Sequence, residues 1–407
     1  MATDLTRIAS ACQREFLVAL IEKVSLENRR KVNWKLSGRQ LARELTRIFS
    51  SDGKVWPQLQ NIESLAMHGG KAIVRSVLYH EQALRDPLDS LDASDETAAV
   101  WLALTSDPHF QYALSALHAD RGLNKRSWKA YRAPFSSDAR FAYDAKTLGV
   151  FQQLVRDAIE KNRALDAPGR LGVHHFNRVV FPQHSHSQRD QDQVTVYAEM
   201  RNVTEEVFND ADEIETRRRK KIDQISVVFD RARREIDVVT IGGGKFIRKV
   251  AHAFCESFST EFPELEDLIR RPVNLQVLAC KPPLPLDGQD LVEDACVDEI
   301  RVMSPTGWLC TFERKSRVRI EEDVYDLAER EFGDASPFKK QGWTVQSARI
   351  RLGMKPDKVG LGAKVRTVEL KPYGRTNLRE HEDKDHFIAN FLLVKWGILE
   401  PQADEED

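Results

Sequence analysis

Hydrophobic residues recur every three or four positions through the first part of the chain, a spacing that places them on one face of an α-helix. The stripe is clearest over residues 5–24 and returns over 41–48, where Ser37 can cap the start of a helix. A further stripe covers residues 148–159. No segment before about residue 168 alternates as a strand does. We therefore predict a helical N-terminal domain over residues 1–165.

After residue 168 the hydrophobic period shortens to two, which indicates β-strands. The strands form four consecutive pairs: 173–181 with 194–201, 222–229 with 236–241, 300–303 with 308–318, and 345–352 with 365–370. Helical stripes follow several pairs, and the last one ends at Gly397. The pattern predicts an α+β protein, in which an antiparallel domain of hairpins and helices covers residues 168–400. Residues 400–407 form an acidic tail.

Composition narrows the classes of partner. The chain has 407 residues, of which 41% are hydrophobic and 30% charged, and its formal net charge is −2. Nucleic-acid binding would therefore need a local basic patch. The five cysteines have no CxxC spacing, and no stretch approaches the roughly 18 apolar residues of a membrane span. We expect a cytoplasmic protein with no membrane partner, no resident metal and no cofactor.

A basic cluster is the first candidate site. RRRKK, at residues 217–221, precedes a turn that carries three more arginines, and a glycine-rich junction with a lysine follows. The candidate phosphate- or nucleic-acid-binding residues are Arg217, Arg218, Arg219, Arg233, Arg234 and Lys245. The first run and the turn should lie at opposite ends of one hairpin. Alternatively, the acidic run DADEIE before RRRKK neutralises the cluster.

Two further segments have a structural and a functional interpretation. In VVTIGGGKFIRKV, the backbone N–H groups of Gly242 to Gly244 and the charge of Lys245 could hold a phosphate, although glycine is also the usual residue of a tight turn. The segment SGRQLARELTRIF could be the DNA-binding helix of a helix-turn-helix element. A helix that packs in a bundle explains the same residues.

Four histidines gather in one predicted hairpin, at positions 174, 175, 184 and 186. His184 and His186 are two residues apart, so on a strand they would face the same side and could share a metal with Glu199. No HExxH motif or paired Cys/His spacing accompanies them. The polarity of the surrounding loop explains these residues, and we expect no metal there.

A carboxylate–lysine pattern suggests an enzyme. Asp357, Glu369 and Lys371 match the PD…ExK pattern of metal-dependent nucleases. Asp357 and Glu369 would hold Mg²⁺, and Lys371 would activate the attacking water. The alternation of Glu369 and Lys371 places both on one face of a strand. MKPDKVGLG reads as a hairpin tip, however, and charge pairing on an exposed face explains the same residues.

The closing stretch VELKPYGRTNLREHEDKDHFIANFLLVKWGIL resembles the ends of uncharacterised bacterial proteins from mobile-element or phage-defence islands. The resemblance implies no reaction and transfers no functional residue. Our leading hypothesis is a non-catalytic binding or adaptor protein that associates with DNA, RNA or other protein subunits, in a bacterial anti-phage defence complex. The alternative is a Mg²⁺-dependent nuclease of the PD-(D/E)xK type. A sensor of a phosphate ligand at the glycine-rich junction is a third hypothesis.

Overall fold

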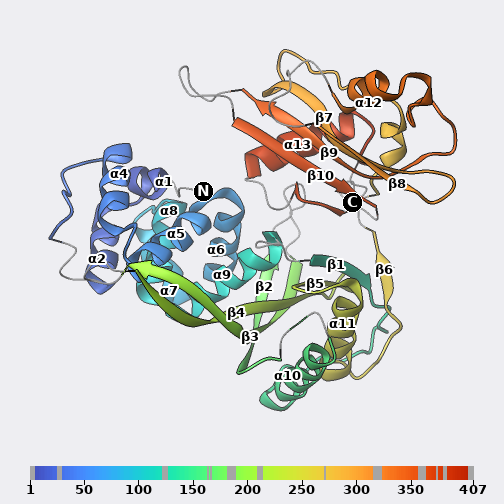
Figure 1. The fold of residues 1–407 in the computed structure, drawn as a ribbon. Helices are drawn as coiled ribbons and strands as arrows, with labels where there is room; N and C mark the ends of the chain where they lie inside the picture. Colours follow the sequence, from blue (N-terminus) through green and yellow to red (C-terminus); the bar gives the residue numbers. More distant parts are fainter. Residues whose placement is uncertain are drawn as a thin grey trace. The chain divides into compact units, whose positions relative to one another are not determined.

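The computed structural model divides into two compact units, residues 1–268 and residues 269–407. The described residues are 5–24, 30–121, 127–162, 165, 167–180, 189–208, 214–269, 272–314, 323–355, 364–372, 375–378 and 383–401. The predicted boundary at residues 165–168 falls inside the first unit, between a helix and a strand. Figure 1 shows the elements of both units.

The first unit begins with a helical bundle. Its helices are α1 (Thr6–Ala11), α2 (Arg14–Val24), α4 (Gly38–Phe49), α5 (Val55–Ala66), α6 (His68–His80), α7 (Gln82–Ser90), α8 (Asp95–Thr105) and α9 (Asp107–Arg121). The apolar stripes face inward, so Leu20, Leu45, Ile62 and Val100 are at most 1% exposed. Burial of these side chains is the main force that holds short helices together.

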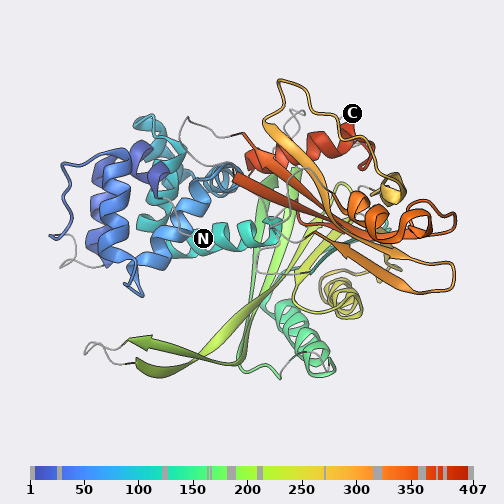
Figure 2. The same ribbon diagram turned by 45° about the horizontal axis from the view of Figure 1, so that its top comes forward.

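A six-stranded antiparallel sheet completes the first unit, in the order β2-β3-β4-β5-β1-β6. Its strands are β1 (Ser127–Arg132), β2 (Leu171–Val180), β3 (Arg189–Phe208), β4 (Ile214–Asp230), β5 (Glu235–Thr240) and β6 (Glu266–Leu268). The helices α10 (Ala145–Glu160) and α11 (Gly244–Phe258) contribute to one apolar core with Val194, Val196 and Val227 of the sheet. Beyond Ala198, β3 pairs with β4 alone, and the two strands form a long arm (Figure 2).

The helical bundle contacts the opposite face of this sheet. Residues that alternate with Val194 and Val196 must point away from α10 and α11. Among them, Thr195 shares a hydrogen bond of 2.8 Å with Ser115 of α9, and the amide of Gln193 donates to the Ser115 hydroxyl over 3.1 Å. Bundle and sheet therefore meet across a hydrogen-bonded contact, and helices cover both faces of the sheet.

The second unit contains a five-stranded antiparallel sheet in the order β11-β10-β9-β7-β8. Its strands are β7 (Val292–Met303), β8 (Leu309–Glu313), β9 (Thr344–Met354), β10 (Lys364–Lys371) and β11 (Arg375–Thr376). The helices α12 (Val324–Phe332) and α13 (Asp383–Lys395) and the 3₁₀ segments η1 (Leu275–Ala279) and η2 (Gly333–Ala335) complete the unit. Val297, Ile350 and Leu370 share their core with Leu392 of α13.

The α+β class and the antiparallel pairing are confirmed. The hairpins that follow residue 168 form two sheets, one in each unit. Strand β1, which inserts between β5 and β6, was not predicted. Among the described residues, no helix is both long and apolar enough to span a lipid bilayer.

Candidate functional site

The six predicted phosphate-binding residues lie at three places in the first unit. Arg217, Arg218 and Arg219 belong to the β3–β4 arm, and their strand partners are Glu205, Thr204 and Val203. Their side chains lie outside the described residues. Arg233 and Arg234 follow Asp230, at the other end of β4. Lys245 lies in the first turn of α11, after β5. The structure does not bring the three groups together.

The turn of residues 231–234, here called the arginine turn, joins β4 to β5 where Asp230 pairs with Glu235. The backbone N–H of Arg233 donates to Asp230 Oδ1 over 3.0 Å, and the carbonyl of Arg234 accepts from the N–H of Ala133 over 2.9 Å. Arg234 has a φ of 57°, in the left-handed region that favours glycine. A side chain in this region costs about 1–2 kcal/mol. Arg234 is therefore an unfavourable choice for folding, and its side chain is exposed.

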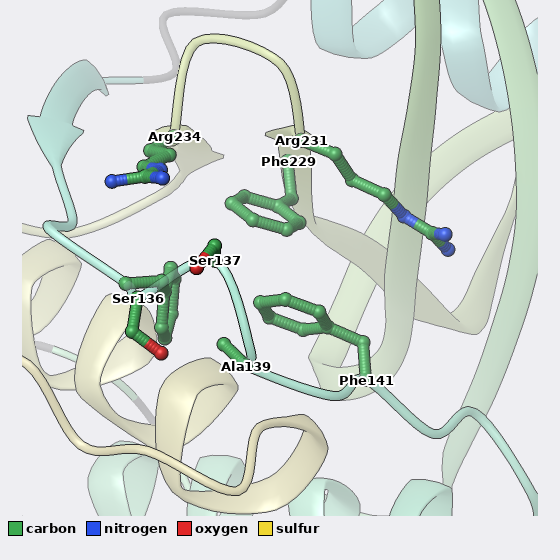
Figure 3. Close-up of a pocket in the computed structure, with 8 residues that line it drawn as sticks. Ser136, Ser137, Ala139, Phe141, Phe229, Arg231 and Arg234 are labelled. Atoms are coloured by element: carbon green, nitrogen blue, oxygen red, sulfur yellow. The ribbon is translucent and has the colours of Figure 1, made fainter.

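A cavity of about 270 Å³ lies beside the arginine turn (Figure 3). It is lined by Phe135, Ser136, Ser137, Ala139, Phe141, Phe229, Arg231 and Arg234. In Figure 3 the side chains of Arg231 and Arg234 leave the turn in opposite directions and flank the cavity. The site thus combines an aromatic base with polar and cationic sides.

The aromatic base is part of the core of the unit. The ring of Phe135 lies 4.9 Å from that of Phe141 and 5.6 Å from that of Phe229, both in edge-to-face contact. Phe135 and Phe229 are 2% and 1% exposed. Rings that are buried in this way offer no open face on which a nucleobase could stack. The cavity therefore provides no stacking platform for a base, and any ligand there would be held by its polar and cationic sides.

A buried carboxylate fixes the position of Arg231. Asp192 of β3 is 1% exposed, and it accepts hydrogen bonds from Arg231 Nη2 over 2.8 Å and from His175 Nε2 over 3.0 Å. Burial alone would raise the pKa of Asp192, but the hydrogen bonds from His175 and Arg231 outweigh it and lower the pKa. The carboxylate is thus held charged. Half of the Arg231 side chain, 51%, remains exposed to a ligand.

Tyr143 covers this ion pair. Its ring stacks on His175 at a centroid distance of 3.9 Å, and the guanidinium of Arg231 lies 6.0 Å from the same ring. Burial, together with the charge of Asp192, raises the pKa of Tyr143 well above its usual range. The phenol therefore stays neutral, and its ring excludes water from the carboxylate.

A second carboxylate orders the other side of the cavity. Glu261 accepts the backbone N–H of Ser136 over 2.8 Å and also accepts the Ser136 hydroxyl. These hydrogen bonds, with a contribution from the charge of Arg234, lower the pKa of Glu261. Ser136 is therefore engaged within the protein. The hydroxyl of Ser137 and the guanidinium of Arg234 are the groups on this side that can face a ligand (Figure 3).

Exposed arginines gather at this end of the sheet. Arg132 pairs with Glu235 at the end of β1 nearest the turn, and Arg140 lies in the loop that lines the cavity. Both arginines are exposed, as is Arg234, whereas the acidic residues Asp192, Asp230 and Glu235 are buried. Asp138, Asp190 and Glu266 are exposed near these arginines, so a polyanion that approaches this surface would meet arginines with carboxylates among them.

The glycine-rich junction is a compact turn at the start of α11. Gly242 has a φ of 114°, and a Cβ there would lie 2.9 Å from the ring of Phe246. Gly243 occupies the N-cap position, and the side chain of Lys129 reaches Gly244. Lys129 and Arg248 both pair with Asp267, at 3.2 and 3.6 Å. The conformation of Gly242 and its contact with Phe246 therefore account for the glycine at this position.

In the nuclease pattern, Glu369 and Lys371 lie on β10 and form an ion pair with each other over 2.8 Å. Both side chains are about half exposed, at 48% and 55%. Asp357 lies outside the described residues, so the structure gives no distance between it and Glu369. In the part of the chain that the structure describes, no group of three or more metal-ligating side chains is present.

Sequence reasoning missed the residues that build the cavity. Ser136 and Tyr143 come from the loop between β1 and α10 and Asp192 comes from β3, and no local motif marks any of them. Of the four histidines, His175 belongs to the site, while His184 and His186 lie outside the described residues. No family model and no curated protein sequence matches the chain. The function must therefore be argued from the geometry.

Proposed function

We propose that the protein is a non-catalytic nucleic-acid-binding protein that holds the phosphate backbone with its arginine turn. The observation that carries the proposal is the backbone of Arg234, which adopts a φ of 57° and presents an exposed guanidinium beside the cavity. Such conformations persist where the surrounding structure imposes them, and they concentrate at functional sites. Glycine would fold more favourably here, so a requirement for the arginine side chain explains the choice.

The arrangement of charges favours a polymer of phosphates over a single small ligand. Arg132, Arg140 and Arg234 belong to three separate segments and are exposed at the same end of the sheet. A small anion in the cavity would need only one or two of them. A nucleic-acid strand presents phosphates in series, and arginine binds phosphate with paired N–H donors.

Asp192 serves this function by orienting Arg231. The bridge from His175 through Asp192 to Arg231 restricts the rotamers of a long side chain before any ligand arrives. A preorganised guanidinium loses less conformational entropy on binding than a mobile one. Asp192 therefore acts as a positioning residue, and Arg231 is the group that it orients.

The test is equilibrium binding of the full chain to labelled DNA and RNA at low salt, measured by fluorescence anisotropy. We replace Arg132, Arg140 and Arg234 with glutamine. If each exposed phosphate contact contributes about 0.7 kcal/mol to the binding free energy, the loss of all three should weaken binding roughly 30-fold. A matched control replaces Arg75, Arg330 and Lys340, which are exposed elsewhere, with glutamine. No binding by the wild type, or equal losses in both variants, would overturn the proposal.

A further inference from the structure

The helix α4 carries a row of arginines on its outer face. Arg39, Arg43 and Arg47 are spaced four residues apart, so they form a line along two turns of the helix, and all three are exposed. The opposite face buries Leu41, Ala42, Leu45 and Phe49 in the bundle core. Figure 1 shows α4 at the edge of the helical bundle. The segment was predicted either as a bundle helix or as a DNA-binding helix, and its two faces are compatible with both.

Packing does not explain the arginine row. Like charges four residues apart on a helix repel one another. Within the described part of the chain, Arg47 has an ion-pair partner, Glu44, whereas Arg39 and Arg43 pair with no acidic residue. Lys35 and Lys54, just before and just after the helix in the chain, are also exposed. Repulsion within the row destabilises the free protein. We therefore expect the row to be stabilised by an anionic partner that it binds.

The helix is held firmly against the bundle. Gly38 has a φ of 49°, and a Cβ at this position would lie 3.2 Å from Ser10 Oγ of α1, a close approach that favours glycine. Arg14 donates to the carbonyl of Leu36 over 2.7 Å and to that of Trp34, which fixes the loop that enters α4. The arginines therefore stand on a rigid support, as a surface for recognition requires.

We infer that α4 is a second contact surface, and that it binds the backbone of double-stranded nucleic acid. The inference rests on the proposed function and adds the class of nucleic acid to it. Three positions on two helical turns span about 12 Å, close to the axial length of four nucleotides in one strand of a duplex. A straight helix also fits the major groove of B-DNA.

The chemistry of α4 distinguishes among polyanionic partners. Its exposed positions are Arg39, Gln40, Arg43 and Arg47. No exposed aromatic side chain on this helix can stack on the bases of a single strand. An acidic protein would also be expected to bury an apolar or aromatic anchor, and α4 exposes none. A purely polar, positive surface is typical of contact with nucleic acid.

Glu44 provides a variant that should increase binding. Its carboxylate accepts hydrogen bonds from Arg47 Nε and Nη2, each over 3.0 Å, so Arg47 is partly neutralised in the free protein. The substitution Glu44→Gln removes this charge and releases the guanidinium. If α4 binds phosphates, the variant should bind duplex DNA about three- to fivefold more tightly at low salt. Glu329→Gln, which removes the closer of the two carboxylates that pair with the exposed Lys339 in the second unit, is the control.

The experiment compares the wild type, Arg39→Gln/Arg43→Gln and Glu44→Gln for binding to a short DNA duplex and to one of its strands. We expect the double variant to bind the duplex about tenfold more weakly, with the salt slope reduced by about two, and Glu44→Gln to bind it more tightly. Thermal unfolding of the double variant should be unchanged, because Arg39 and Arg43 are exposed. Poly-L-glutamate should compete poorly at equal charge.

Duplex binding that is unchanged in both α4 variants would overturn the inference. So would effects that are equal on the single strand, or competition by poly-L-glutamate as strong as that by DNA, which would indicate an acidic protein partner. The experiments can refute the two proposed sites independently of each other. Losses confined to the Arg132, Arg140 and Arg234 variant contradict the role of α4 and leave the proposed function standing. A loss confined to Arg39→Gln/Arg43→Gln contradicts the role of the arginine turn.

Discussion

The substitution Arg234→Gly separates the cost of folding from the benefit of binding. In the wild type, a φ of 57° at Arg234 costs about 1–2 kcal/mol. Glycine removes this cost, but it also has more conformational freedom in the unfolded chain, which lowers the free energy of unfolding by about 0.5–1 kcal/mol. The net gain should be about 0.5–1 kcal/mol in the free energy of unfolding, which raises the Tm of the first unit by roughly 1–4 °C. We therefore expect a more stable protein that binds nucleic acid less well.

Binding should weaken because one phosphate contact is lost, which lowers the slope of log K against log salt by about 0.9 for duplex DNA. Calorimetry measures the first effect, and anisotropy over a salt series measures the second. Arg234→Gln is the first control, since it removes the charge without relieving the backbone and should lower only the affinity.

Asp92→Gly is the second control, because Asp92 also has a positive φ, 46°, elsewhere in the first unit. This variant should change stability without changing binding. An Arg234→Gly protein that is less stable than the wild type, or that binds with an unchanged salt slope, would refute the reasoning.

Three further predictions concern other residues. Asp192→Ala should lower the free energy of unfolding by about 2–3 kcal/mol, because it leaves Arg231 and His175 without their buried acceptor, and chemical denaturation measures the loss. Because the fold lowers the pKa of Asp192, its stabilisation is complete above the unfolded pKa of about 3.9 and disappears as the pH falls further; a difference between wild type and variant that grew in acid would contradict this sign. Glu369→Gln and Lys371→Ala should leave binding within about twofold of the wild type, since they remove only an exposed ion pair, and with Mg²⁺ or Mn²⁺ the wild type should not cleave DNA or RNA; cleavage that vanishes in both variants would favour the nuclease alternative. The last variant replaces five arginines of the basic cluster with alanine: Arg217, Arg218, Arg219, Arg233 and Arg234. It should bind all nucleic-acid sequences more weakly and to the same extent, with a flatter salt dependence. Unchanged binding would show that the basic cluster has no role.

The order of elements could be predicted because local patterns determine it. Alternation over β9 and β10 reflects one face against a core and one less buried face, and the buried residues of α11 recur with the helical period of three to four. Strand β1 lacks such a pattern, because Ala130 and Tyr131 are both buried on opposite sides of a sheet that helices cover on both faces. Its identity depends on pairing with β5 and β6, which lie far away in the sequence.

The candidate site was only partly predictable for a related reason. The charges of Arg233 and Arg234 were visible as a run in a turn, and that run placed a candidate site at this end of the hairpin. The sequence carries no sign that Asp192 is buried beside Arg231, because the two meet only when β3 and β4 pair. The positive φ of Arg234 could not be predicted from the sequence either, because glycine or asparagine usually occupies such a position in a turn.

Site-specific photo-crosslinking at the arginine turn tests the central claim most directly. Ala232 is exposed at the tip of the turn, between Arg231 and Arg233, so a photoreactive residue can replace it without removing a charge. The control places the same residue at Lys340 in the second unit, which is also exposed. We predict that irradiation joins labelled nucleic acid to the protein through position 232 and not through position 340, with a yield that falls as salt rises. Equal yields at the two positions, or no crosslink at position 232 while the protein is bound, would contradict the account.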